Sequence, residues 1–103
     1  MTKLELNDKL VELYDLEPFT MIGCDIPAIE NSAIMFDLMI EHKIIPDFGV
    51  VYIGSVKHEY VTARQIRTYG SSYIVFLKDH ESPQAAVRYA AAMALVKLAE
   101  SKS

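Results

Sequence analysis

Residues 82–98, Ser-Pro-Gln-Ala-Ala-Val-Arg-Tyr-Ala-Ala-Ala-Met-Ala-Leu-Val-Lys-Leu, form the stretch that decides the fold. Ser82 is a good N-cap, because its hydroxyl can accept a hydrogen bond from an unpaired backbone N–H. Pro83 suits the first helical position, where its missing N–H costs nothing. The sequence therefore predicts a long helix that packs closely on a sheet. The apolar positions of its core face recur at helical spacing, and they are Val87, Ala90, Ala91, Ala94, Leu95 and Leu98.

Two further helices are predicted in the first half of the chain. Thr2 and Glu5 match a capping box, and leucines at helical spacing follow, which predicts a helix over residues 3–14. A second helix is predicted over residues 28–42, beginning after Asp25-Ile26-Pro27. Its expected buried face carries Ile29, Ala33, Phe36 and Ile40, and its solvated face carries Glu30, Asp37 and Glu41.

The strands are predicted mainly in the second half of the chain. Residues 19–24 fit either a short strand or a packed loop. The predicted strands, which are rich in β-branched and aromatic residues, span residues 48–53, 59–69 and 72–77. The segments between elements are a connection at 44–47, a turn region at 55–58 and a tight turn at Gly70-Ser71.

The predicted order is helix, helix, two to four antiparallel strands, helix, which is an α+β domain with helices packed on a sheet. A chain of 103 residues is one domain, spanning residues 1–103, and can fold without metals or disulfides. Its apolar fraction of 51% is generous for a small monomer. We therefore expect some apolar surface to be buried against another subunit.

Charge and cysteine content exclude several classes of function. A net charge of −4 argues against nonspecific nucleic-acid binding, which needs clustered basic residues. The last helix is Ala-rich, as in the double-stranded-RNA-binding fold, but Pro83, Gln84 and Arg88 stand where that fold needs lysines. Cys24 is the only cysteine, so no intrachain disulfide can form, and we expect a cytoplasmic protein. No apolar run reaches the length of a membrane span.

The usual catalytic and metal-binding signatures are missing from the sequence. The four glycines are scattered, and there is no Cys-x-x-Cys or His-Glu-x-x-His motif. His42, His58 and His80 lie in separate segments without metal-ligand spacing. Cys24 has apolar neighbours and is interpreted as a small buried hydrophobe rather than a nucleophile. We therefore predict no catalytic residue, metal or cofactor.

One polar cluster is a candidate ligand site, in the segment from His58 to Tyr73. Arginine forks bind phosphate bidentately and tyrosines stack on planar rings, so such a set suits a nucleotide. The candidate residues are His58, Arg64, Arg67, Tyr69 and Tyr73. In a regular strand Arg64 and Arg67 face opposite sides of the sheet, so one ligand would meet only one of them. The alternative is a solvent-exposed strand with mixed charges.

The last helix also carries a second apolar stripe, opposite its core face. Its residues are Tyr89, Ala92, Met93 and Val96. Exposed apolar stripes of this kind mark interfaces, which predicts a homo-oligomer contact through Tyr89, Met93 and Val96. The alternative is a helix that is buried on two sides.

The order and pattern of these segments resemble a family of small phage-encoded proteins, the phage alpha-beta (ABA) sandwich domains. The resemblance covers most of the chain and is carried by residues 2–11, 26–33 and 82–92. It implies a non-enzymatic phage or prophage protein that acts stoichiometrically in the host cytoplasm. Such a protein would counter host defence, either by sequestering a nucleotide signal or by inhibiting a host defence protein. The alternative is a structural or assembly subunit of a phage or other oligomeric particle.

Overall fold

The computed structural model describes residues 2–16, 19–21, 24–65 and 74–101. Within these residues there are three α-helices: α1 (Lys3–Tyr14), α2 (Ser32–His42) and α3 (Pro83–Ser101). The strands are β1 (Phe19–Met21), β2 (Cys24–Pro27), β3 (Ile44–Ile53), β4 (Val56–Gln65) and β5 (Val75–Phe76). Two 3₁₀ turns complete the chain, η1 (Ala28–Glu30) and η2 (Leu77–Asp79). The predicted α+β class and the order helix, helix, strands, helix are confirmed.

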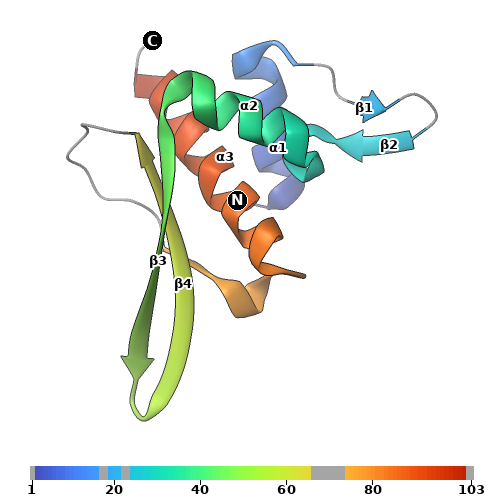
Figure 1. Ribbon diagram of the computed structural model, residues 1–103. Coiled ribbons are helices and arrows are strands. Elements are labelled where there is room, and N and C mark those ends of the chain that lie inside the picture. The colour runs from blue at the N-terminus through green and yellow to red at the C-terminus, as the bar shows by residue number, and fades with distance from the viewer. Residues whose placement is uncertain (1, 17–18, 22–23, 66–73, 102–103) are drawn as a thin grey trace.

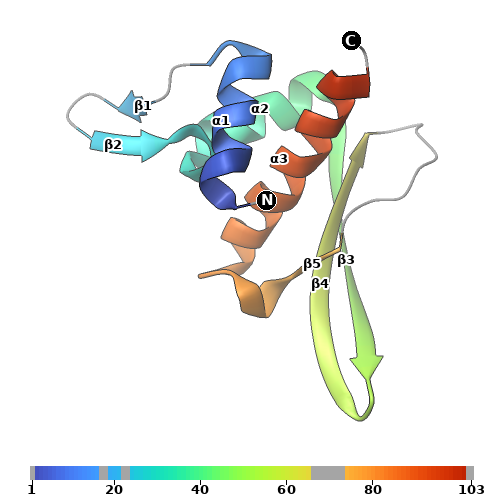
Figure 2. The same ribbon diagram turned by 180° about the vertical axis from the view of Figure 1, so that it is seen from behind.

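Helix α3 is the centre of the domain. It lies between the β3–β4–β5 sheet on one side and α1 and α2 on the other (Figure 1). Seen from behind, the small β1–β2 hairpin stands on the side of the helices away from that sheet (Figure 2). The side chains of Leu6, Leu10, Met35, Val61 and Leu95 are almost fully buried and form the core between these layers.

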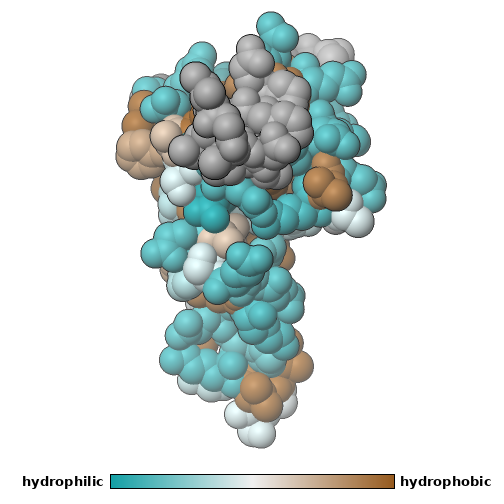
Figure 3. All heavy atoms as spheres, turned by 90° about the vertical axis from the view of Figure 1, so that its right-hand side faces the viewer, coloured by the Kyte–Doolittle hydropathy of each residue, from teal (hydrophilic) through white to brown (hydrophobic). Residues whose placement is uncertain are grey.

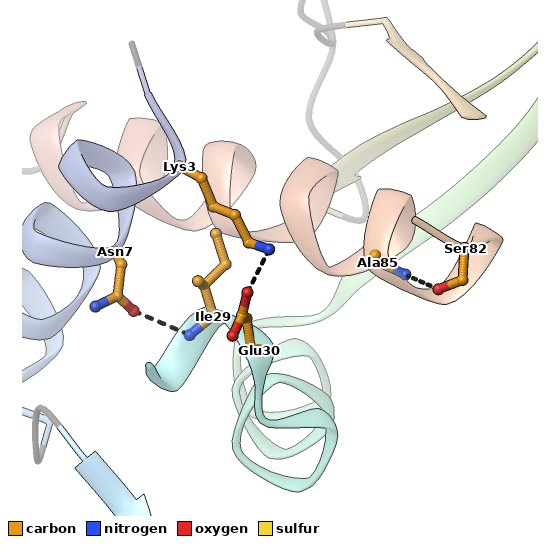
Figure 4. Close-up of polar contacts among 6 residues, drawn as sticks. All are labelled: Lys3, Asn7, Ile29, Glu30, Ser82 and Ala85. Atoms are coloured by element: carbon orange, nitrogen blue, oxygen red, sulfur yellow. Dashed lines mark hydrogen bonds and ion pairs between the residues drawn. The ribbon is translucent and has the colours of Figure 1, made fainter. Parts of the chain in front are cut away.

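Local capping explains why α1 and α3 begin where the sequence predicts. The Thr2 hydroxyl accepts a hydrogen bond from the backbone N–H of Glu5, 3.1 Å away, at the start of α1. At α3 the Ser82 hydroxyl accepts from the backbone N–H of Ala85, also at 3.1 Å (Figure 4). Both predicted N-caps are therefore confirmed.

The main sheet has the antiparallel order β3-β4-β5. Strands β3 and β4 form a long hairpin, paired without a bulge from Ile44 opposite Gln65 to Ile53 opposite Val56. Gly54 has a φ of +67°, which suits a two-residue hairpin turn with glycine as its first residue. The turn end of this hairpin extends past the helices (Figures 1 and 2). This projection gives the molecule a longest dimension of 46 Å.

The prediction for the second helix was wrong at its start and on its buried face. The first predicted residues, Ala28–Glu30, form the 3₁₀ turn η1, and α2 begins only at Ser32 with Asn31 as its N-cap. The Asn31 side chain accepts a hydrogen bond from the backbone N–H of Ile34. The buried side chains of α2 are Met35 and Leu38, whereas Ala33, Phe36 and Ile40, which were expected in the core, are exposed. Phe36 is 62% exposed and Ile40 53%. Ile29 is buried as expected but lies in η1.

The predicted strands differ from the observed ones mainly at their ends. Residues 44–47, predicted as a connection, are the first part of β3, and the predicted turn region 55–58 is mostly in β4. Strand β4 accordingly begins before the predicted residue 59. The third predicted strand retains only Val75 and Phe76, because Leu77 starts the 3₁₀ turn η2. The Gly70-Ser71 turn, and residues 66–69, 72 and 73 of the predicted strands, lie outside the described residues.

The second apolar stripe of α3 is not an exposed face. Ala92 and Val96 are buried within the chain, and Tyr89 and Met93 are half-buried against the core. Of the two interpretations of the sequence, burial of the helix on two sides is the one observed. Val96, 4% exposed and already packed, is the residue of the predicted interface that the structure corrects, whereas a contact through half-buried Tyr89 and Met93 stays a prediction.

Candidate interaction surface

The most unusual surface of the molecule is the turn end of the β3–β4 hairpin, residues 48–59, which we call the arm. Among the large apolar side chains of the arm, Tyr52 is 66% exposed, Phe48 60% and Ile53 57%. Val50, Val51 and Val56 are exposed as well. In Figure 3 the arm is the narrow lower part of the molecule, with apolar residues at its end. An exposed apolar cluster of this kind marks an interaction site.

Strand β3 of the arm is apolar on both faces. Successive side chains of a strand point to opposite faces, so Phe48, Val50 and Tyr52 share one face with their partners on β4, which are Val61, Glu59 and Lys57. The apolar side chains of this face therefore come from β3, and the two charged residues opposite them pair with each other. Val51 and Ile53 lie on the other face. There the Tyr60 side chain covers Gly49 so closely that a Cβ on Gly49 would lie 2.4 Å from the Tyr60 Oη. A sheet face that served only as a cover for the core would be polar on its outer side.

An apolar groove begins where the arm leaves the helices. It has a volume of about 320 Å³, and its lining includes Met35, Phe36 and Met39 of α2, Phe48 of the arm and Val87 of α3. Arg88 lies at one end and donates a hydrogen bond from Nη1 to the Ser32 hydroxyl at 3.0 Å. Its buried Nε has no hydrogen-bond partner among the described residues. The groove continues the apolar face of the arm, because Phe48 belongs to both.

A second cavity, of about 610 Å³, lies between the start of α3 and strand β5. Half-buried Tyr89 and Met93 contribute to its wall, together with His80 and Lys3. The His80 and Tyr89 rings lie 4.8 Å apart between centroids. Burial is the main cause that lowers the pKa of His80 below its usual value, and nearby Lys3 lowers it further against the opposing effect of Asp79. The fold therefore favours neutral His80.

This lowered pKa predicts a loss of stability in mild acid. In the pH window between the folded-state pKa of His80 and its ordinary value of about 6.5, the unfolded chain binds more protons than the folded one. Stability therefore rises with pH through that window and falls as the pH drops through it. Urea unfolding of the native chain and of His80→Gln should show a smaller dependence on pH in the variant. An equal dependence in both would contradict the assignment to His80.

The predicted nucleotide residues are only partly described. His58 and Arg64 lie on the same face of β4 but six residues apart, which is about 20 Å along a strand. They are therefore too far apart to contact one phosphate group together. Arg67, Tyr69 and Tyr73 lie outside the described residues. Binding of a nucleotide at the five residues stays a prediction.

His58 has different neighbours from those expected. Its ring packs edge-on against Phe76, with centroids 5.8 Å apart. It also lines a shallow cavity of about 470 Å³ with Lys57, Lys78 and His80, and two carboxylates share that cavity. Those carboxylates belong to Glu59, which pairs with Lys57 at 3.7 Å, and to Glu81. The charge there is mixed, which does not favour a strongly anionic ligand.

The three histidines each contact a separate aromatic ring, His42 with Tyr14, His58 with Phe76 and His80 with Tyr89. In the part of the chain that the structure describes, no three His, Cys, Asp or Glu side chains gather to hold a metal ion. Glu30, on the expected solvated face, instead pairs with Lys3 of α1 (Figure 4). The Cys24 side chain lies outside the described residues.

Comparisons with known protein families, with curated proteins and with solved structures find no match to this chain. Within the described segments, no helix has both the length and the apolar character needed to cross a membrane. The arm itself was missed by sequence reasoning, which predicted residues 48–53 as a strand without an exposed surface role. The sequence signal that could have indicated it is the uncharged run Phe-Gly-Val-Val-Tyr-Ile, which has apolar residues at the positions that face each side of the sheet.

Proposed function

We propose that this chain is a non-enzymatic binding protein that acts by contact with another protein through its arm. The observation that carries the proposal is that β3 of the arm is apolar on both faces and that the arm projects beyond the helices. Burial of apolar surface is the main driving force of protein association, at about 25 cal/mol per Å². Tyr52 and Phe48 supply the aromatic anchors that interfaces favour.

The resemblance to phage ABA sandwich domains suggests two settings for this contact. In one, a phage protein in the host cytoplasm binds and inhibits a host defence protein. In the other, the chain is a subunit of a larger assembly. Both settings stay predictions, and both require an exposed surface for a protein partner, which the arm provides.

A photo-crosslinking experiment tests the proposal. A benzoylphenylalanine placed at Tyr52, near the turn of the arm, should form protein adducts when the chain is irradiated in the cells that naturally produce it. The same group at Glu12, an exposed position on α1, is the matched control. Adducts are identified by mass spectrometry, including adducts with a second copy of the chain.

We expect the Tyr52 position to give at least one discrete adduct that the Glu12 position does not. Loss of that adduct on replacing neighbouring Ile53 with Lys would place the contact on the arm. If both positions give the same background, the arm is not a contact surface and the proposed function is wrong.

A further inference from the structure

The outer edge of β3 presents backbone groups in a regular pattern. A two-residue turn makes its flanking residues a hydrogen-bonded pair, so Ile53 and Val56 exchange both backbone bonds. Bonded pairs alternate along an antiparallel ladder, and the next ones are at Val51 and Gly49. The N–H and C=O groups of Phe48, Val50 and Tyr52 consequently point away from β4. Among the described residues, β3 pairs with β4 alone.

The arm lacks the features that normally protect a sheet edge. Edge strands are usually short, charged, bulged or interrupted by proline. Strand β3 pairs with β4 along its full ten residues without a bulge. Its proline and its one charge, Pro46 and Asp47, lie before the arm begins. Residues 48–53 thus form an uncharged strand of high β-propensity with a free edge, which is a template for another strand.

We propose that a second copy of this chain pairs with this edge, β3 against β3 in antiparallel orientation, with the two-fold axis at Val50. The inference rests on the proposed function, because it names the protein that the arm binds. The two sheets would join into one six-stranded sheet with β3 and its copy at the centre. Such a contact is isologous, so it closes as a dimer.

The sequence of β3 is self-complementary in this register. Val50 lies opposite Val50 of the partner subunit, and Phe48 lies opposite Tyr52 of the partner subunit on the same face. Two aromatic–aromatic cross-strand pairs result, which are among the favourable pairs in sheets. Asp47 lies opposite Ile53 of the partner subunit, so no two like charges meet. About six ladder hydrogen bonds would form over residues 48–52.

The pairing also buries apolar surface. The exposed apolar side chains of the arm total on the order of 600 Å² per copy, and the pairing covers the sides of those that border the partner strand. The backbone edge of β3 supplies further buried area. In the joined sheet, Phe48, Val50 and Tyr52 of the two copies lie side by side on one face, where they shield one another from water.

Proline at position 50 tests the pairing, because it removes an outward N–H without removing a bond between β3 and β4. Sedimentation velocity should give twice the single-chain mass of 11.6 kDa for the native chain and for the control Val50→Thr, which keeps the N–H. For Val50→Pro we expect the dissociation constant to rise about tenfold or more, since a ladder bond and the fit of the strand are lost. Circular dichroism checks that each variant is folded.

A second variant keeps the test decisive if Val50→Pro does not fold. Tyr52→Lys places a charge beside the partner's Phe48 at an exposed position, and it should likewise raise the dissociation constant about tenfold or more. A native chain that sediments as a monomer at all concentrations, or a folded Val50→Pro that dimerises like Val50→Thr, would overturn the pairing. If the native chain is monomeric but the Tyr52 crosslink reaches a different protein, the proposed function stands and this inference fails.

Discussion

Replacing Leu95 with alanine is expected to lower the free energy of unfolding by about 2–5 kcal/mol. Leu95 is fully buried in the middle of α3, the helix that contacts both the sheet and the other two helices. Its backbone carbonyl also accepts a hydrogen bond from the Tyr14 hydroxyl of α1. Truncation of this side chain therefore leaves a cavity in the core around which the helices and the sheet pack.

Urea unfolding of Leu95→Ala measures this effect, with Leu4→Ala as its matched control. Leu4→Ala is the same substitution on α1, but the Leu4 side chain is 68% exposed. Its truncation should therefore lower the free energy of unfolding only slightly. Equal and small effects of the two substitutions, below roughly 1 kcal/mol, would contradict the central position of α3 in the core.

The second large effect is expected at Asn7, the one buried polar side chain among the described residues. Its Oδ1 accepts a hydrogen bond from the backbone N–H of Ile29 at 3.0 Å, which ties α1 to the segment before α2 (Figure 4). Asn7→Leu would leave that buried N–H without an acceptor. We expect the free energy of unfolding to fall by about 1–3 kcal/mol.

Asn31→Ala provides the comparison for Asn7. It removes a hydrogen bond of the same type, to the backbone N–H of Ile34, but at a partly buried helix N-cap, where the loss is about 1 kcal/mol. Thermal or urea unfolding should therefore rank Asn7→Leu as the more damaging change. An Asn7→Leu variant as stable as the native chain would show that Ile29 finds another acceptor.

The starts of α1 and α3 could be predicted because their signals are local. Thr2 and Ser82 each cap a helix within three residues of themselves. The buried face of α2 could not be predicted, because apolar side chains lie on nearly every side of this helix. Periodicity cannot choose between Met35 and Phe36 in such a helix, and the choice depends on where α3 lies.

The start of β3 could not be predicted from the sequence for a different reason. Helix α2 ends at His42, and its C-cap Lys43 adopts a left-handed φ of 58° without being glycine. Pro46 then argued against a strand. Position 46 belongs to the set whose N–H would point outward from β3, and a proline costs no ladder bond at such an edge position. Recognising this requires the register with β4, which sequence alone does not supply.

The candidate surface was also beyond sequence reasoning, because projection is a tertiary property. The run from Phe48 to Ile53 has the composition of a core strand, and only its position past the helices exposes it. Conversely, charge in the segment from His58 to Arg64 suggested one site, while the extended geometry of β4 spreads those side chains along the strand.

The most direct test that the outer edge of β3 in the arm is a contact surface is hydrogen exchange at two backbone amides. Val50 and Tyr52 have outward N–H groups, whereas Val51 and Ile53 have N–H groups bonded to β4, so the arm contains its own reference. We predict that Val50 and Tyr52 are protected at high protein concentration and lose protection on dilution, while Val51 and Ile53 stay protected. Rapid exchange of Val50 and Tyr52 at every concentration would contradict the account.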